Sequence, residues 1–83
     1  MKDISEIKYT VEDLKEGKLT RASMIEDFEA IRFEAGLVKT ALEHGMIDGE
    51  YLNDESRELC RAIVELESSI NYCWEHDCFG GGD

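Results

Sequence analysis

Two long stretches of the chain repeat their apolar residues at alternating spacings of three and four. In the first stretch these residues are Met24, Phe28, Ile31, Ala35, Val38 and Leu42. In the second they are Leu59, Ile63, Leu66, Ile70 and Cys73. This spacing places side chains on one face of an α-helix, and the chain has no proline to break either helix. We therefore predict an all-α fold: an antiparallel hairpin of two helices, each about 30 Å long at ~1.5 Å per residue.

Local signals mark the expected ends of these helices. Ser23 followed by Glu26 predicts a capping box at the start of the first long helix, and Gly45 is a suitable C-terminal cap. The second long helix is expected to begin at Asn53 or Asp54, because both residue types cap helices well. The connector between the helices contains apolar residues, which predicts that it packs against the hairpin.

The first 20 residues predict a shorter helix or arm, over 3–16 or only over 10–16. Pairs that suit capping boxes are Asp3 with Glu6 and Thr10 with Asp13. Gly17 is expected to end this helix. The chain then divides into an arm (1–20), a hairpin (21–75) and a flexible glycine-rich tail (76–83) within a single domain.

A second set of apolar residues lies off the two stripes: Phe33, Leu37, Ala41, Val64 and Tyr72. Two helices cannot bury apolar residues on two faces each. A further surface is needed, which either the N-terminal helix or another copy of the chain could supply, and we expect another copy. The sequence therefore predicts a homo-oligomer that associates through this second apolar face.

The chain is strongly acidic, with 20 acidic against 9 basic residues and a formal net charge of −11. Such a charge disfavours binding to nucleic acid or to an anionic membrane, and it suits a basic partner. No apolar run approaches the ~18 residues of a membrane span, and the first ten residues resemble no signal peptide. Three cysteines make an odd number, which favours reduced thiols and a cytoplasmic setting.

The C-terminal cysteines and histidine are the first candidates for a chemical site. Cys73, His76 and Cys78 could ligate zinc, with Cys60 or His44 as a fourth ligand. Their spacing matches no common zinc motif, and a cysteine on a core stripe is usually a small apolar residue. We therefore expect no metal and no cofactor.

The residue pattern supports neither a catalytic site nor a calcium site. Acidic neighbours raise the pKa of a thiol and oppose a nucleophilic pair of Cys78 with His76. The acidic segment 48–55 lacks the alternating oxygen ligands of a calcium loop. The sequence thus predicts a binding protein, not an enzyme.

Arg57 and Arg61 are the only basic residues of the acidic C-terminal half. They lie four residues apart and therefore share one helix face. Arginine suits phosphate because its planar group donates two parallel hydrogen bonds. The alternative is that both pair with acids on their own helix, namely Asp54, Glu58 or Glu65.

Residues 57–74 resemble the last helix of the phage anti-CBASS and anti-Thoeris sponge hairpin family. That helix has an Arg near its start, then Leu-Ser-x-Ala, Leu-Gln/Glu and a Phe-Met-x-Leu/Ala close. The corresponding positions here are Arg57, Leu59, Cys60, Ala62, Leu66, Glu67, Ile70 and Asn71. The segment Ala35-Gly36-Leu37 is similar to the middle of the family's preceding helix, so the likeness covers about residues 24–74.

This resemblance implies a small oligomeric hairpin that binds cyclic or related signalling nucleotides between subunits. Sequestering them deprives a bacterial defence effector of its signal. In the family, aromatic residues stack on bases and basic residues hold phosphates. Arg57 carries over by position, and the further ligand-binding candidates are Arg61, Lys8, Tyr9 and Tyr51.

Two alternatives rest on composition instead of resemblance. The acidic surface could mimic a nucleic-acid backbone and block the basic groove of a host defence protein, as an anti-CRISPR does. The chain could instead be a general interaction module that docks a partner helix on its leftover apolar stripe.

Overall fold

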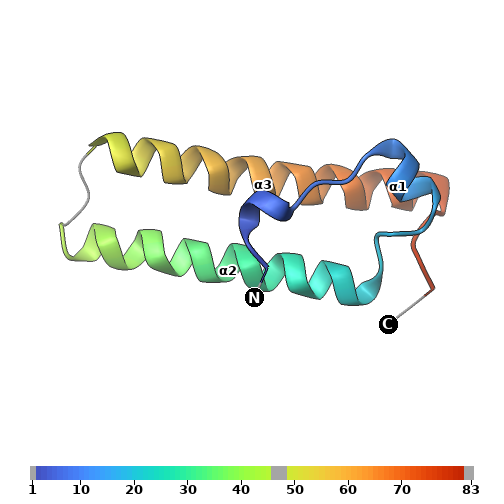
Figure 1. Ribbon diagram of the computed structural model, residues 1–83, viewed down its shortest axis with the longest axis horizontal. Helices are drawn as coiled ribbons and strands as arrows, with labels where there is room; N and C mark the ends of the chain where they lie inside the picture. Colours follow the sequence, from blue (N-terminus) through green and yellow to red (C-terminus); the bar gives the residue numbers. More distant parts are fainter. Residues whose placement is uncertain (1, 46–48, 82–83) are drawn as a thin grey trace.

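The computed structural model describes residues 2–45 and 49–81, and the side chains of 2–45 and 54–81. Two long helices, α2 (Arg21–Glu43) and α3 (Gly49–His76), lie side by side and run antiparallel (Figure 1). A short 3-10 helix, η1 (Ile4–Glu6), and a short α-helix, α1 (Val11–Lys15), precede them. The helical hairpin with a smaller N-terminal helix is therefore confirmed, and the described residues contain no strand.

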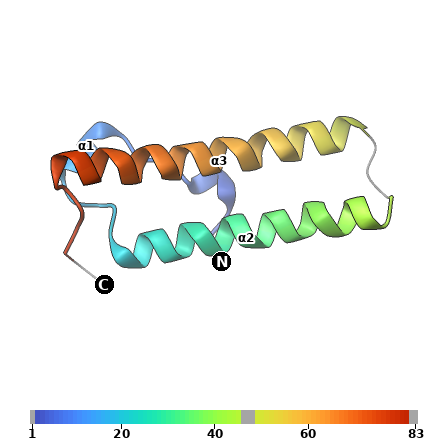
Figure 2. The same ribbon diagram turned by 180° about the vertical axis from the view of Figure 1, so that it is seen from behind.

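The N-terminal segment lies along one face of the hairpin, as both ribbon views show (Figures 1 and 2). Its two predicted capping boxes are both present. Asp3 and Glu6 flank η1, while Thr10 and Asp13 flank the start of α1. The residues between these helices are not helical, so the prediction of one helix over 3–16 is wrong and the shorter alternative holds. Thr10 has the extended backbone of an N-cap, which starts a new helix instead of continuing the previous one.

Gly17 ends α1 as predicted. Its φ of +75° lies in the left-handed region, which only glycine adopts without strain. Its amide donates to the Leu14 carbonyl, and the next amide, of Lys18, donates to the Asp13 carbonyl at 3.0 Å. Together these bonds satisfy the last carbonyls of the helix in a Schellman motif.

The start of α2 differs from the prediction by three residues. Thr20 is the N-cap: its side chain accepts a hydrogen bond from the Ser23 amide, and Ser23 Oγ accepts one from the Thr20 amide at 2.8 Å. Ser23 thus closes the capping box and does not open it, so the predicted Ser23–Glu26 box is wrong. Gly45, with φ +63°, follows the end of α2 as predicted.

The second long helix begins earlier than predicted, at Gly49 instead of Asn53 or Asp54. Part of the predicted connector is therefore helical, and its apolar residues Met46 and Ile47 lie outside the described residues. The helices contain 23 and 28 residues, which gives lengths of roughly 35 and 42 Å. The hairpin is correspondingly longer than the sequence indicated.

The buried core is one cluster formed by the N-terminal segment, α2 and α3. Its buried residues are Ile4, Ile7, Leu14, Leu19, Ala30, Ala62, Leu66 and Cys73. Half of them precede α2, so the N-terminal segment is a structural part of the core. Leu66 and Cys73 confirm the predicted stripe on α3.

The predicted stripe on α2 holds in part. Val38 is buried, Met24 and Ile31 pack against the core, and Ala35 is half-buried. Phe28 is 55% exposed, and Leu42 is exposed as well. The buried side of α2 is shifted toward Asp27 and Ala30, because the N-terminal segment covers that side. Trp74, at the end of the α3 stripe, is 81% exposed.

The described part of the predicted tail, residues 76–81, lies against the rest of the fold. His76 belongs to α3, and Phe79 packs against the core. The Gly80 amide donates to the Leu19 carbonyl at 3.0 Å. A Cβ at Gly80 would lie only 2.0 Å from the Gly17 carbonyl oxygen, so this close approach requires glycine.

Within the described ranges, no helix combines the length and the apolar character that crossing a bilayer requires.

Candidate functional site

The face of the hairpin that carries the N-terminal segment is held by buried and half-buried polar side chains. Arg61 donates to the Ile4 carbonyl at 2.8 Å and to the Ile7 carbonyl at 3.2 Å. Its Nε donates to Glu58 at 3.0 Å. These bonds satisfy the Ile7 carbonyl, and they add a second donor to the Ile4 carbonyl, which also accepts from the Ile7 amide at 3.1 Å. The predicted pairing of Arg61 with an acid on its own helix is confirmed, and its donors are used within the fold.

Asp27 lies at the centre of this face and is fully buried, with 0% of its surface exposed. Its carboxylate accepts a hydrogen bond from Lys2 Nζ at 2.6 Å and one from the Tyr9 hydroxyl at 3.2 Å. Burial lowers the pKa of Lys2, but the hydrogen bond and the charge of Asp27 outweigh it, so this pKa is raised. The buried charge is thus compensated by an ion pair and a hydrogen bond, as buried charges require.

A second carboxylate anchors the backbone of the same segment. Glu65 Oε1 accepts a hydrogen bond from the Tyr9 amide at 3.0 Å. We call Asp27, Arg61 and Glu65 the N-terminal clamp. The sequence analysis missed it, although one signal was available: Asp27 lies three residues after Met24 and four before Ile31, so a carboxylate occupies a core-facing position of the helix.

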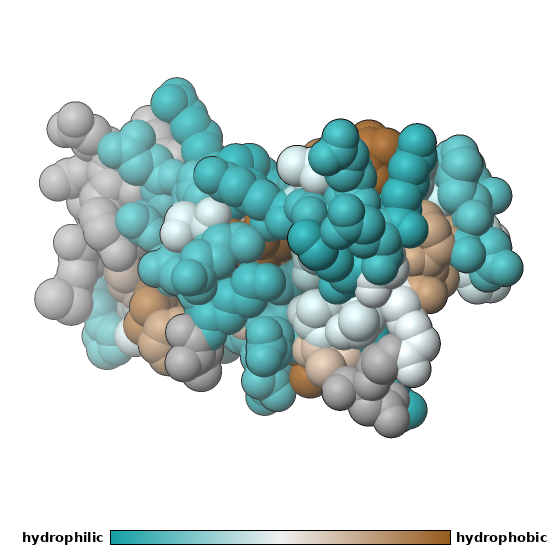
Figure 3. All heavy atoms as spheres, turned by 45° about the vertical axis from the view of Figure 1, so that its right-hand side comes forward, coloured by the Kyte–Doolittle hydropathy of each residue, from teal (hydrophilic) through white to brown (hydrophobic). Residues whose placement is uncertain are grey.

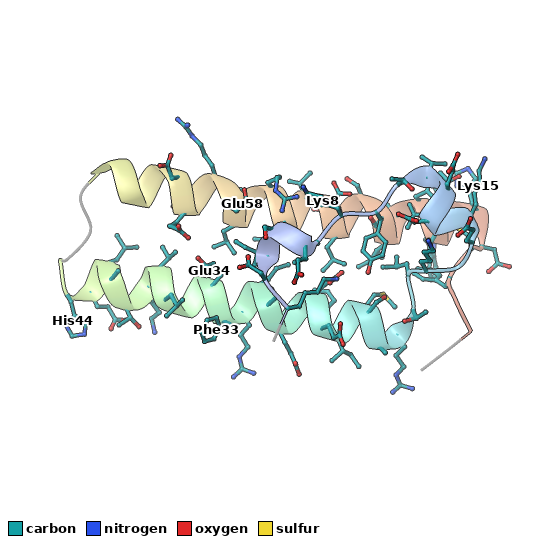
Figure 4. The ribbon with its side chains drawn as sticks, in the orientation of Figure 1. Lys8, Lys15, Phe33, Glu34, His44 and Glu58 are labelled. Atoms are coloured by element: carbon teal, nitrogen blue, oxygen red, sulfur yellow. The ribbon has the colours of Figure 1, made fainter. Side chains whose placement is uncertain are left out.

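The clamp changes the interpretation of the predicted ligand-binding residues. Arg57 and Arg61 lie on one face of α3 as expected, but only Arg57 is classed as exposed. Tyr9 is half-buried, with its ring near Lys2 and its hydroxyl on Asp27. Lys8 is exposed beside α3 (Figure 4). The side chain of Tyr51 lies outside the described residues. Arg57 and Lys8 are therefore the predicted basic groups with exposed side chains.

An apolar groove lies between α2 and α3, with a volume of about 360 Å³. It is lined by Phe28, Ile31, Ile63, Leu66, Glu67, Ile70 and Asn71. Ile63 lies two residues from both Arg61 and Glu65, and two residues correspond to about 200° around a helix. The groove therefore opens on the face of the hairpin that the N-terminal segment leaves uncovered. Figure 2 shows the ribbon from this side, with the N-terminal segment behind the two long helices.

A smaller apolar patch lies on the outer side of α2. Phe33 and Leu37 are both exposed there, and Phe33 points away from α3 (Figure 4). Val64, another residue of the predicted second face, is exposed as well, whereas Ala41 is half-buried and Tyr72 packs against the core. A different side of the molecule is mostly hydrophilic, with small apolar areas between polar side chains (Figure 3).

A pair of carboxyl groups bridges the two long helices. Glu34 points from α2 toward α3 (Figure 4) and shares a hydrogen bond with Glu55. This hydrogen bond, together with burial and the nearby negative charges, raises the pKa of Glu34 to about 7. Two carboxyl groups can bond in this way only when one of them is protonated.

The cysteines and histidine weighed as zinc ligands do not converge. His76 Nδ1 lies 2.9 Å from the Tyr72 carbonyl oxygen, and its ring stacks on that of Tyr72 at 4.1 Å. Cys73 and Cys78 adjoin each other, with their sulfur atoms 3.2 Å apart. Cys60 is exposed elsewhere on α3, and His44 lies at the opposite end of the hairpin (Figure 4). Among the residues searched, no group of three or more His, Cys, Asp or Glu could hold a metal ion.

In comparisons with known proteins, no family model, no curated protein and no solved structure matches this chain.

Proposed function

We propose that this protein is a non-enzymatic binding protein that works as a homo-oligomer assembled through the groove between α2 and α3. The observation that carries the proposal is the exposure of large apolar side chains along this groove. Ile63 is 42% exposed and Phe28 more than half exposed. Each large side chain that leaves water on association contributes roughly 1.5–3 kcal/mol.

A second copy of the chain is the occupant that suits the groove best. Two hairpins that pack face to face form a four-helix bundle, the common arrangement for antiparallel helices with one uncovered face. Both helices contribute apolar residues to the groove, so a two-fold contact would be self-complementary. The groove lining is apolar except for Glu67 and Asn71, which lets most of the −11 charge stay outside the contact.

The test is the oligomeric state of the protein and of three variants. Ile63→Asp places a charge in the groove and should give a monomer with intact helicity. Val64→Asp is the matched control: Val64 is the next residue, is 59% exposed and does not line the groove. Wild type and Val64→Asp should both remain oligomeric in light scattering and sedimentation at micromolar concentration.

Two outcomes would contradict this assembly. A monomeric wild type would leave the groove to a different protein. Dissociation by Leu37→Asp but not by Ile63→Asp would move the contact to the outer patch of α2, where Leu37 is exposed.

A second candidate function is capture of a phosphorylated signalling nucleotide at a seam of this oligomer, in the host cytoplasm. The observation that favours it is the exposed side chain of Arg57, which symmetry would repeat around the assembly. Several arginines near one axis could outweigh the acidic surface locally, because salt screens charges beyond ~8–10 Å.

Calorimetry against cyclic di- and trinucleotides and cyclic ADP-ribose species tests this candidate. Wild type should bind one of them, and Arg57→Ala should weaken binding by about tenfold or more, since a charge-assisted hydrogen bond contributes ~1.5–3 kcal/mol. Arg21→Ala is the control, because Arg21 is exposed on the other long helix. The result would favour the acidic-mimic alternative over nucleotide capture if no nucleotide binds, a basic defence protein binds wild type, and the variant Glu67→Lys/Glu75→Lys loses that binding.

A further inference from the structure

The end of α3 brings two cysteines into contact through backbone geometry. Asp77 follows the helix with φ +50°, and the Cys78 amide donates to the Cys73 carbonyl at 3.3 Å. This is the long hydrogen bond of a Schellman motif, which packs the side chains of its first and last residues together. Here both residues are cysteines, and their sulfur atoms lie 3.2 Å apart.

The two thiols differ in their access to solvent. Cys73 is fully buried in the core, whereas Cys78 is partly exposed. Cys78 also lines a surface hollow together with Lys15 and His76. Burial and the adjacent thiol raise the pKa of Cys73 to about 11, so this thiol is a poor nucleophile toward a reagent in solvent and reacts only with a sulfur already in contact with it. A reagent from solvent therefore meets Cys78 first, with Cys73 in contact behind it.

We propose that Cys73 and Cys78 form a thiol–disulfide modification site, which a small organic disulfide converts to an intrachain bond. The Cys78 thiolate attacks one sulfur of the reagent, forms a mixed disulfide and releases one small thiol. The sulfur of Cys73 then attacks that of Cys78, closes the intrachain bond and releases the second small thiol. Two protein thiols are oxidised, one reagent disulfide is reduced, and the two thiol protons leave with the released thiols.

The closed bond locks the C-terminal segment onto the hairpin. Cys78 is two residues before Gly80, whose amide donates to the Leu19 carbonyl, and next to Phe79, which packs on the core. Hydrogen exchange at the Gly80 amide requires this segment to open. Joining Cys78 to the rigid helix restricts that opening, so oxidation should slow exchange at Gly80.

Intact mass spectrometry tests the bond itself. All proteins carry Cys60→Ser, because the Cys60 thiol is exposed and would react on its own. After treatment with excess oxidised glutathione or cystamine, the protein should lose the mass of two hydrogen atoms and retain no added group. The Cys60→Ser/Cys78→Ser control should keep its mass. A stable mixed disulfide at Cys78, a disulfide-linked dimer, or two thiols that stay free would each overturn the proposal.

Amide exchange tests the lock. Exchange at Gly80 should slow several-fold on oxidation and recover on reduction, while exchange in the middle of α2 stays unchanged. Circular dichroism establishes that both proteins are folded before treatment. If the bond closes and Gly80 exchanges at the same rate or faster, the lock is wrong.

Discussion

Asp27 shows how one buried carboxylate organises a whole face of this protein. It joins α2 to the N-terminal segment through Lys2 and the Tyr9 hydroxyl, at 2.6 and 3.2 Å. A buried charge of this kind is costly unless every partner is present. The clamp therefore fixes the position of the N-terminal segment more than it adds to the stability of the fold. Any other position of the segment would leave the Asp27 charge buried without a partner.

Replacing this carboxylate with an amide should loosen the N-terminal segment. Asp27→Asn keeps the shape of the side chain but removes the charge that pairs with Lys2. We expect the free energy of unfolding to fall by about 1–3 kcal/mol, measured by urea unfolding. Glu29→Gln is the control, because Glu29 is exposed on the same helix, and it should change stability by less than about 0.5 kcal/mol. Equal effects of the two variants would contradict a special role for Asp27.

The helix ends that were predicted correctly are those set by residues close together in the chain. Gly17 and Gly45 both adopt the left-handed backbone expected of them. The pair Thr10 and Asp13 forms its capping box because both partners lie within one turn. Thr20 was missed in favour of Ser23, since several residues of this region have side chains that can cap and sequence alone does not rank them.

The start of α2 allows a direct test of which residue caps it. Thr20→Ala removes the side-chain oxygen that accepts from the Ser23 amide, and should cost about 1 kcal/mol of stability. Thr20→Ser keeps the hydroxyl and should retain most of that stability. Glu26→Ala should change unfolding by under about 0.5 kcal/mol, because Glu26 is exposed and does not close the box. A larger loss from Glu26→Ala than from Thr20→Ala in thermal unfolding would reverse this assignment.

Features that depend on residues far apart in the chain could not be predicted from spacing. The burial of Asp27 depends on Lys2 and Tyr9, and the position of the described tail depends on the Gly80–Leu19 hydrogen bond. The candidate site behaves in the same way. Helical spacing correctly placed Arg57 and Arg61 on one face, but it could not show that Arg61 is used by carbonyls more than 50 positions earlier.

In the molecule as a whole, one face of the hairpin is covered and the other is exposed. The N-terminal segment covers one face with apolar residues and the clamp, and the groove leaves the other face open. A chain of 83 residues buries only a thin core, and covering the second face would enlarge it. The acidic surface would limit such an association to contacts that keep carboxylates apart or protonated, as the pair of Glu34 and Glu55 already requires within one chain.

The Glu34–Glu55 pair should make stability depend on pH near neutrality. The hydrogen bond with Glu55, burial and neighbouring negative charge raise the pKa of Glu34 from 4.5 to about 7 in the folded protein. The folded state therefore binds this proton more tightly than the unfolded state, and the contribution is fully present below pH 4.5. It is lost progressively as the pH rises through 7. Urea midpoints should therefore fall between about pH 5.5 and 8, a range that lies mostly above the titration of ordinary carboxylates.

Neutralising one carboxyl group of the pair distinguishes its effect on stability from the effect of the overall negative charge. Glu34→Gln keeps a hydrogen-bond donor for Glu55 at every pH, so its urea midpoint should exceed that of wild type above neutrality and vary less with pH. Glu29→Gln removes one charge from the same helix without touching the pair, and should keep the wild-type slope. All other titratable groups are common to wild type and Glu34→Gln, so their contributions cancel in the comparison. Parallel pH profiles for wild type and Glu34→Gln would show that the carboxyl pair does not control stability, and that the dependence arises from the −11 net charge instead.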